Sequence, residues 1–115
     1  MKFAKRTILL SLLCMSTAHA NYWCTGKVTG LAISKTGLVT VSGIQGLNAA
    51  VLCVIGSTAN GVSPELCRTI YATLLTAYLT DKPVTFAYDD ALTCSSHPSW
   101  AWLTGWYHGP EFTTN

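Results

Sequence analysis

The chain has 115 residues, a length that fits one small domain, and half of its residues are hydrophobic while 10% are charged. Seven Lys and Arg residues against five Asp and Glu residues give a formal net charge of +2, but three of the basic residues lie within the first six positions. The other four face five acids, a balance of −1, which excludes the strongly basic surface that a nucleic-acid-binding domain needs.

The first 20 residues are typical of a secretory signal peptide. A basic start precedes an apolar run at residues 8–15, and Ala18-His19-Ala20 supplies the small residues that signal peptidase requires. The run is too short to span a bilayer, which needs about 20 apolar residues. We therefore expect cleavage after Ala20, a single mature domain at residues 21–115, no membrane span, and a secreted or periplasmic location.

Three strands are predicted in the first half of the mature chain. The stretch from Cys24 to Gly43 is rich in valine, threonine and isoleucine, and residues 35–37 form a turn signal within it, so it predicts two strands joined by a tight turn. Residues 49–55 are a continuous apolar run, which predicts a strand buried on both faces. Residues 56–61 are predicted as a loop from their composition.

A helix follows this loop. Ser63 is a suitable N-cap, Pro64 suits the first helical position, and Glu65 complements the positive end of the helix dipole. Proline at position 83 ends the helix because it has no amide proton to donate. Apolar residues recur at helical spacing and predict a buried face made of Leu66, Cys67, Ile70, Tyr71, Leu74, Ala77 and Tyr78.

The remaining chain predicts two more strands. Residues 84–88 alternate, which places Val84, Phe86 and Tyr88 on one side, and Asp89-Asp90 is interpreted as a solvated turn. The final stretch concentrates aromatic rings, and we expect a last strand there, followed by a loose tail at residues 109–110. The aromatic residues of this stretch are Trp100, Trp102, Trp106 and Tyr107.

The cysteines predict a covalent framework. Once Cys14 leaves with the signal peptide, four remain, and an even number in a small exported domain predicts two disulfides. Four cysteines allow three pairings, and the sequence does not choose among them. Cys94 and His97 have the spacing of zinc ligands, but no second ligand pair accompanies them, so no metal or cofactor is expected. The remaining cysteines are Cys24, Cys53, Cys67 and Cys94.

The order of elements is three strands, one helix and two strands. This order predicts a small β-rich α+β fold, a five-stranded OB-like barrel with its helix between the third and fourth strands. Other α+β arrangements fit the same order.

Several segments resemble a known family. The helix–strand unit at residues 68–89 carries Thr69-Ile70-Tyr71, Tyr78, Thr80, Pro83-Val84 and Tyr88. Residues 23–26 add Trp-Cys-Thr-Gly, and residues 52–55 add a cysteine within an apolar strand. Together these resemble the B subunits of the subtilase-cytotoxin and typhoid-toxin type. The resemblance implies an OB fold, a ring of five subunits that serves an exported catalytic subunit, and recognition of sialylated host glycans. Lys27 aligns with the serine through which that family contacts sugar.

The implied barrel also suggests a disulfide pairing. Its first and fourth strands run antiparallel side by side, so Cys24, before the first strand, meets Cys94, after the fourth. Cys53 and Cys67 then join the third strand to the helix. On a chain-entropy model the shorter bridge stabilises the fold by about 3 kcal/mol and the longer one by about 4 kcal/mol.

Trp100, Trp102, Trp106 and Tyr107 are the candidate ligand-binding residues, because aromatic rings stack on sugar faces. The alternative is that these rings fill the barrel core. His97 and His108 lie outside any nucleophile motif, so no catalytic residue and no enzymatic activity are expected. We expect a secreted binding module that recognises a host glycan or other cell-surface receptor. A small secreted or periplasmic enzyme inhibitor, or an envelope protein without a soluble ligand, is the alternative.

Overall fold

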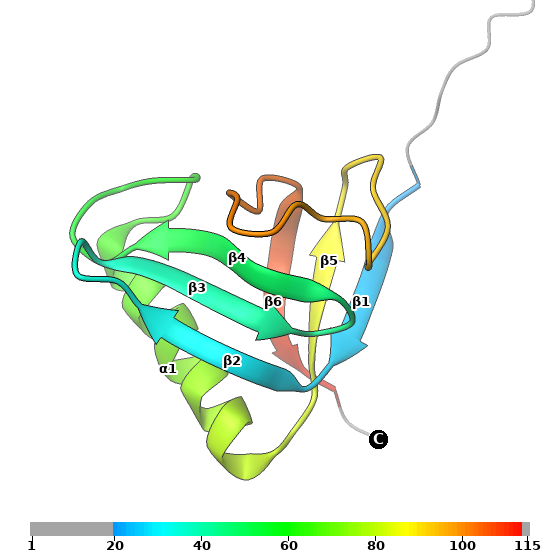
Figure 1. Ribbon diagram of the computed structural model, residues 1–115, viewed down its shortest axis with the longest axis horizontal. Helices are drawn as coiled ribbons and strands as arrows, with labels where there is room; N and C mark the ends of the chain where they lie inside the picture. The colour runs from blue at the N-terminus through cyan, green and yellow to red at the C-terminus, as the bar shows by residue number, and fades with distance from the viewer. Residues whose placement is uncertain (1–19, 114–115) are drawn as a thin grey trace, which may run out of the picture.

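A computed structural model describes residues 20–113 as one helix and six strands, and nearly all of the predicted signal peptide, at residues 1–19, lies outside the described part. The strands form two antiparallel three-stranded sheets, ordered β1-β5-β6 and β2-β3-β4, and the helix contacts both (Figure 1). The elements in chain order are β1 Tyr22–Gly26, β2 Val28–Ile33, β3 Leu38–Gly43, β4 Leu47–Val54, α1 Pro64–Thr80, β5 Val84–Tyr88 and β6 Trp106–Phe112.

The predicted five-stranded OB-like barrel is wrong: the six strands form two separate sheets and the helix follows the fourth strand, because the expected first strand is divided between the two sheets. Up to Gly26 it pairs with β5, and from Val28 it pairs with β3. The Lys27 carbonyl between them accepts a hydrogen bond from the Ile44 amide at 2.9 Å. A Cβ at Gly43 would lie 2.8 Å from the Thr29 amide nitrogen, so only glycine permits the close approach of the two chains at this corner.

The two sheets are not joined at the other end of the chain either. Residues 100–103 were expected to belong to the last strand, but they lie beside β4, with one parallel bridge between Val51 and Trp102 and a hydrogen bond from the Trp100 amide to the Asn48 carbonyl. The last strand, β6, begins at Trp106 instead. It includes residues 109–110, which were wrongly expected to form a loose tail. A Cβ at Gly109 would lie 3.2 Å from the Phe86 Cα, so glycine allows β6 to approach β5, and Pro110 is tolerated because β6 is an edge strand.

The predicted helix is confirmed. The Ser63 side chain accepts a hydrogen bond from the Leu66 amide, Pro64 is the first residue, and Asp81 ends the helix in a left-handed conformation. The buried face consists of Cys67, Ile70, Leu74 and Ala77. Leu66 and Tyr78, which were expected on that face, are 49% and 50% exposed.

One core lies among the sheets and α1, and it includes the fully buried side chains of Leu52, Leu74, Phe86 and Tyr88. Both disulfides are part of this core, with the pairing that the resemblance implied: Cys24–Cys94 ties β1 to the segment after β5, and Cys53–Cys67 ties β4 to α1. Such bridges are typical of proteins that fold in an oxidising compartment. No helix within residues 20–113 is long and apolar enough to cross a bilayer.

Candidate functional site

Residues 89–105, which connect β5 to β6, form what we call the aromatic loop. The loop contains no named helix or strand, yet it carries two of the four tryptophans. Trp100 is 75% exposed and Trp102 is 43% exposed. A segment this long without regular structure is uncommon in a compact domain and is usually functional.

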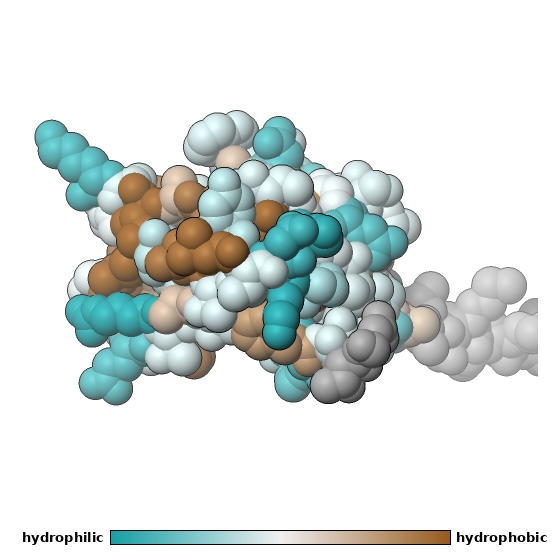
Figure 2. Space-filling view, turned by 90° about the horizontal axis from the view of Figure 1, so that it is seen from below, coloured by the Kyte–Doolittle hydropathy of each residue, from teal (hydrophilic) through white to brown (hydrophobic). Residues whose placement is uncertain are grey.

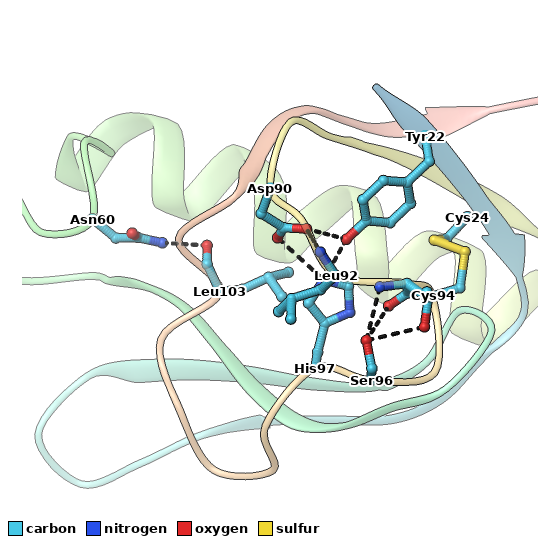
Figure 3. A network of polar contacts seen from close by, with 10 residues as sticks. Tyr22, Cys24, Asn60, Asp90, Leu92, Cys94, Ser96, His97 and Leu103 are labelled. Carbon is cyan, nitrogen blue, oxygen red and sulfur yellow. Dashed lines mark hydrogen bonds and ion pairs between the residues drawn. A yellow bond between two sulfur atoms is a disulfide. The ribbon is translucent and has the colours of Figure 1, made fainter. Parts of the chain in front are cut away.

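The first half of the loop is held by a polar network (Figure 3). The Tyr22 hydroxyl donates a short hydrogen bond to the Asp90 carboxylate and lies 3.0 Å from Nε2 of His97. Nε2 of His97 is also 3.4 Å from Oδ2 of Asp90, and the His97 side chain is only 3% exposed. The Asp90 carboxylate accepts the Leu92 amide at 2.9 Å as well. Asp90 is therefore an anchor of the loop and not the solvated turn residue that the sequence predicted.

Aromatic packing completes this network. The Tyr22 and Tyr88 rings stack with centroids 5.0 Å apart, and the His97 ring lies 4.5 Å from Tyr88. Burial raises the pKa of both tyrosines above the ordinary value, and the hydrogen bond to Asp90 raises the pKa of Tyr22 further. Tyr22 is therefore a neutral donor at physiological pH. Among the described residues, the Tyr88 hydroxyl and Nδ1 of His97 have no hydrogen-bond partner.

The second half of the loop is held by the backbone of β4. The Val51 amide donates to the Ala101 carbonyl, and the Leu103 amide donates to the Val51 carbonyl, both at 2.9 Å. The Asn60 side-chain amide adds hydrogen bonds to the Leu52 and Leu103 carbonyls, each 3.0 Å long. The tryptophans are thus presented by a segment that is fixed on both sides of them.

The disulfide at Cys94 and the turn between β3 and β4 fix the middle of the loop. Cys94 is bonded to Cys24 in β1. A Cβ at Gly46 would lie 2.8 Å from the Cys94 carbonyl oxygen, so the loop backbone lies directly on this turn. Nearby, the Asn48 amide donates to the Ser99 hydroxyl at 3.1 Å, next to Trp100.

The structure separates the four predicted ligand-binding residues. Trp100 and Trp102 lie in the loop and not in the last strand, where they were expected, and Trp100 has a positive φ of 57°. Trp106 is half-buried against Phe86, with ring centroids 5.5 Å apart, and its indole N–H donates to the Gly109 carbonyl. Tyr107, in β6, is 48% exposed. The alternative of a core role therefore fits Trp106 alone.

Sequence reasoning missed an exposed ring pair on sheet β1-β5-β6. Ala87 in the central strand β5 pairs with Trp23 of β1 on one side and with His108 of β6 on the other. The Trp23 and His108 rings meet edge to face, with their centroids 6.0 Å apart. The register shift between Ala87 and Tyr88 adds Tyr107 beside His108, and the Tyr107 hydroxyl accepts a hydrogen bond from the Asn21 amide. The sequence does carry a signal for the exposed position of Trp23: neighbouring residues of a strand face opposite sides, so a buried Cys24 in β1 predicts an exposed Trp23.

The two histidines of the described part of the chain lie in different settings. The buried His97 side chain has little surface with which to contact a substrate, and the exposed His108 lies 3.5 Å from Glu111 without a nucleophile motif. Cys94, one of the two residues with zinc-ligand spacing, is in a disulfide. Within residues 20–113, no three His, Cys, Asp or Glu side chains gather to hold a metal ion.

Comparisons with known proteins identify no relative. No family model matches the chain, and no curated protein or solved structure is significantly similar to it.

Proposed function

We propose that the mature domain is an exported, non-catalytic module that binds uncharged glycans through Trp100 and Trp102. The observation that carries this proposal is the contrast within the aromatic loop: its backbone is fixed to three other parts of the fold, while its two tryptophan rings face solvent. An exposed indole offers a large flat apolar surface to the apolar face of a sugar ring.

Preorganisation explains why the loop would be built in this way. A binding loop that must become ordered loses affinity to conformational entropy, whereas a loop already held by a disulfide and backbone hydrogen bonds does not. The anchors at Cys94, Ala101 and Leu103 hold the loop in one conformation before any ligand arrives.

The charge of the loop favours an uncharged ligand. Residues 89–105 contain two aspartates and no lysine or arginine. Two polar residues beside Trp100 are neutral: Ser99 precedes it in the chain, and the Asn48 carbonyl accepts a hydrogen bond from its amide. A sialic acid carboxylate would normally be paired with a cation, so the proposed ligand differs from the sialylated glycans that the family resemblance implied.

The test is glycan-array screening of the mature, oxidised protein, followed by calorimetry with Trp100→Ala and Trp102→Ala. Each substitution should lower the affinity for the best uncharged glycan by about tenfold or more. Trp23→Ala is the matched control, because it removes an exposed tryptophan outside the loop and should leave this affinity unchanged. Wild-type affinity in both loop variants would refute the proposal.

Self-association and an exported catalytic partner are further proposals that the resemblance suggests. Exposed apolar side chains offer contact surface for the first, and Figure 2 shows several of them gathered on the face seen from below. The exposed apolar residues include Ile33, at 42%, and Leu79, at 72%. The mass of the oxidised protein in solution tests self-association, and a monomer would count against a ring.

A further inference from the structure

A hollow of about 440 Å³ lies between the start of α1 and β6, a size typical of small-ligand sites. The N-terminal end of α1 and the preceding loop form one wall, with Asn60, Val62, Leu66 and Ile70. The other wall comes from β6 and includes Tyr107 and His108. The hollow adjoins the aromatic loop, because Asn60 also donates to the Leu103 carbonyl at the end of that loop.

The two walls differ in chemistry. On the helix side, Val62 and Ile70 are 5% exposed, and Leu66 extends this apolar surface into solvent at 49%. On the strand side, the Tyr107 ring is held in place because the Asn21 amide donates to its hydroxyl. A ligand that fits both walls has one small apolar group and one ring that can lie against an aromatic side chain.

The polar groups of the hollow restrict the ligand further. None of its lining residues is Lys, Arg, Asp or Glu, and the lining His108 already lies 3.5 Å from Glu111, so a charged ligand would find no unpaired counter-ion among them. The Asn60 side-chain nitrogen is engaged with two backbone carbonyls, which leaves its amide oxygen as an acceptor. The ligand should therefore be uncharged and should carry a hydrogen-bond donor close to its apolar group.

We propose that the hollow binds an N-acetylated amino sugar. The acetamido methyl group lies against Leu66, Val62 and Ile70, the acetamido N–H donates to the Asn60 side-chain oxygen, and the sugar ring lies against Tyr107. This inference rests on the proposed function in taking a glycan as the ligand. It adds a second site, away from Trp100 and Trp102, and the class of sugar that the site selects.

Three β-1,4-linked tetrasaccharides that differ only in the substituent at carbon 2 test the inference. They are the tetramers of N-acetylglucosamine, glucosamine and glucose, and calorimetry measures their affinities for the oxidised protein. The acetylated tetramer should bind about tenfold or more tightly than either of the others, since the site is built for both the methyl group and the N–H. Equal binding of the three, or binding of none, overturns the inference.

Variants show which site gives the preference. Leu66→Asn and Tyr107→Ala should remove it, whereas Leu79→Asn, an exposed leucine of the same helix outside the hollow, should keep it. Circular dichroism confirms that each variant folds. A preference that survives Trp100→Ala supports the hollow even where the proposal for the loop fails. If the preference for the acetylated tetramer is lost in Trp100→Ala but kept in Leu66→Asn, the hollow is not the binding site and the aromatic loop is.

Discussion

Helix α1 and the aromatic loop are both held firmly, but by opposite means. The helix is specified by neighbours in sequence: a serine cap at one end, an apolar face at regular spacing, and a left-handed residue at the other end. The loop is specified by residues far away in sequence, since Asp90 and His97 meet Tyr22 and Ala101 meets Val51. Local rules therefore build the scaffold, and long-range contacts shape the surface that we propose to bind ligand.

One disulfide holds the aromatic loop and the other holds α1, so removing each in turn tests the two parts separately. Removing Cys24–Cys94 with a double serine substitution should lower the free energy of unfolding by about 4 kcal/mol, and removing Cys53–Cys67 by about 3 kcal/mol, because the first closes a longer segment of chain. Urea denaturation measures both values. Hydrogen exchange should show lost protection in the aromatic loop for the first variant and at the start of α1 for the second. The same pattern of lost protection in both variants would contradict the view that the two disulfides hold different parts of the fold.

The sequence predicted the elements that depend on local signals, which are α1, the turn between β2 and β3, and the buried strand β4. It could not predict that one strand is divided at Lys27, because this division depends on the close approach to Gly43. Nor could it place Trp100 and Trp102, whose backbone follows β4 through a single bridge. The rings of Trp23 and His108 meet only because β5 lies between them, with Ala87 opposite both.

Asp90 tests the long-range contacts that hold the aromatic loop, without altering helix α1. Asp90→Asn keeps the shape of the side chain but removes the charge that accepts the Tyr22 hydroxyl and the Leu92 amide. Because hydrogen bonds to a charged group stabilise more than neutral ones, the free energy of unfolding should fall by about 2 kcal/mol. Glycan affinity should fall with it, because the loop loses an anchor.

The neighbouring aspartate provides the control for that variant. Asp89→Asn makes the same change of charge at an exposed side chain, so it should change stability by less than about 0.5 kcal/mol and leave glycan affinity as it is. If the two variants behave alike in urea denaturation and calorimetry, charge alone is responsible and the polar network does not anchor the loop.

Ser63 tests the contacts between sequence neighbours that specify helix α1. Ser63→Ala removes the hydroxyl that accepts the Leu66 amide at 3.2 Å, which should lower the free energy of unfolding by about 1 kcal/mol. Hydrogen exchange should increase only in the first turn of α1, and binding at Trp100 and Trp102 should be unchanged, because no anchor of the loop involves Ser63.

Ser99→Ala is the matched control: it removes an exposed hydroxyl that accepts a hydrogen bond from the Asn48 side chain next to Trp100. It should cost little stability and should affect binding more than Ser63→Ala does. The opposite ranking in calorimetry would mean that the capped end of the helix, and not the loop, governs the binding surface.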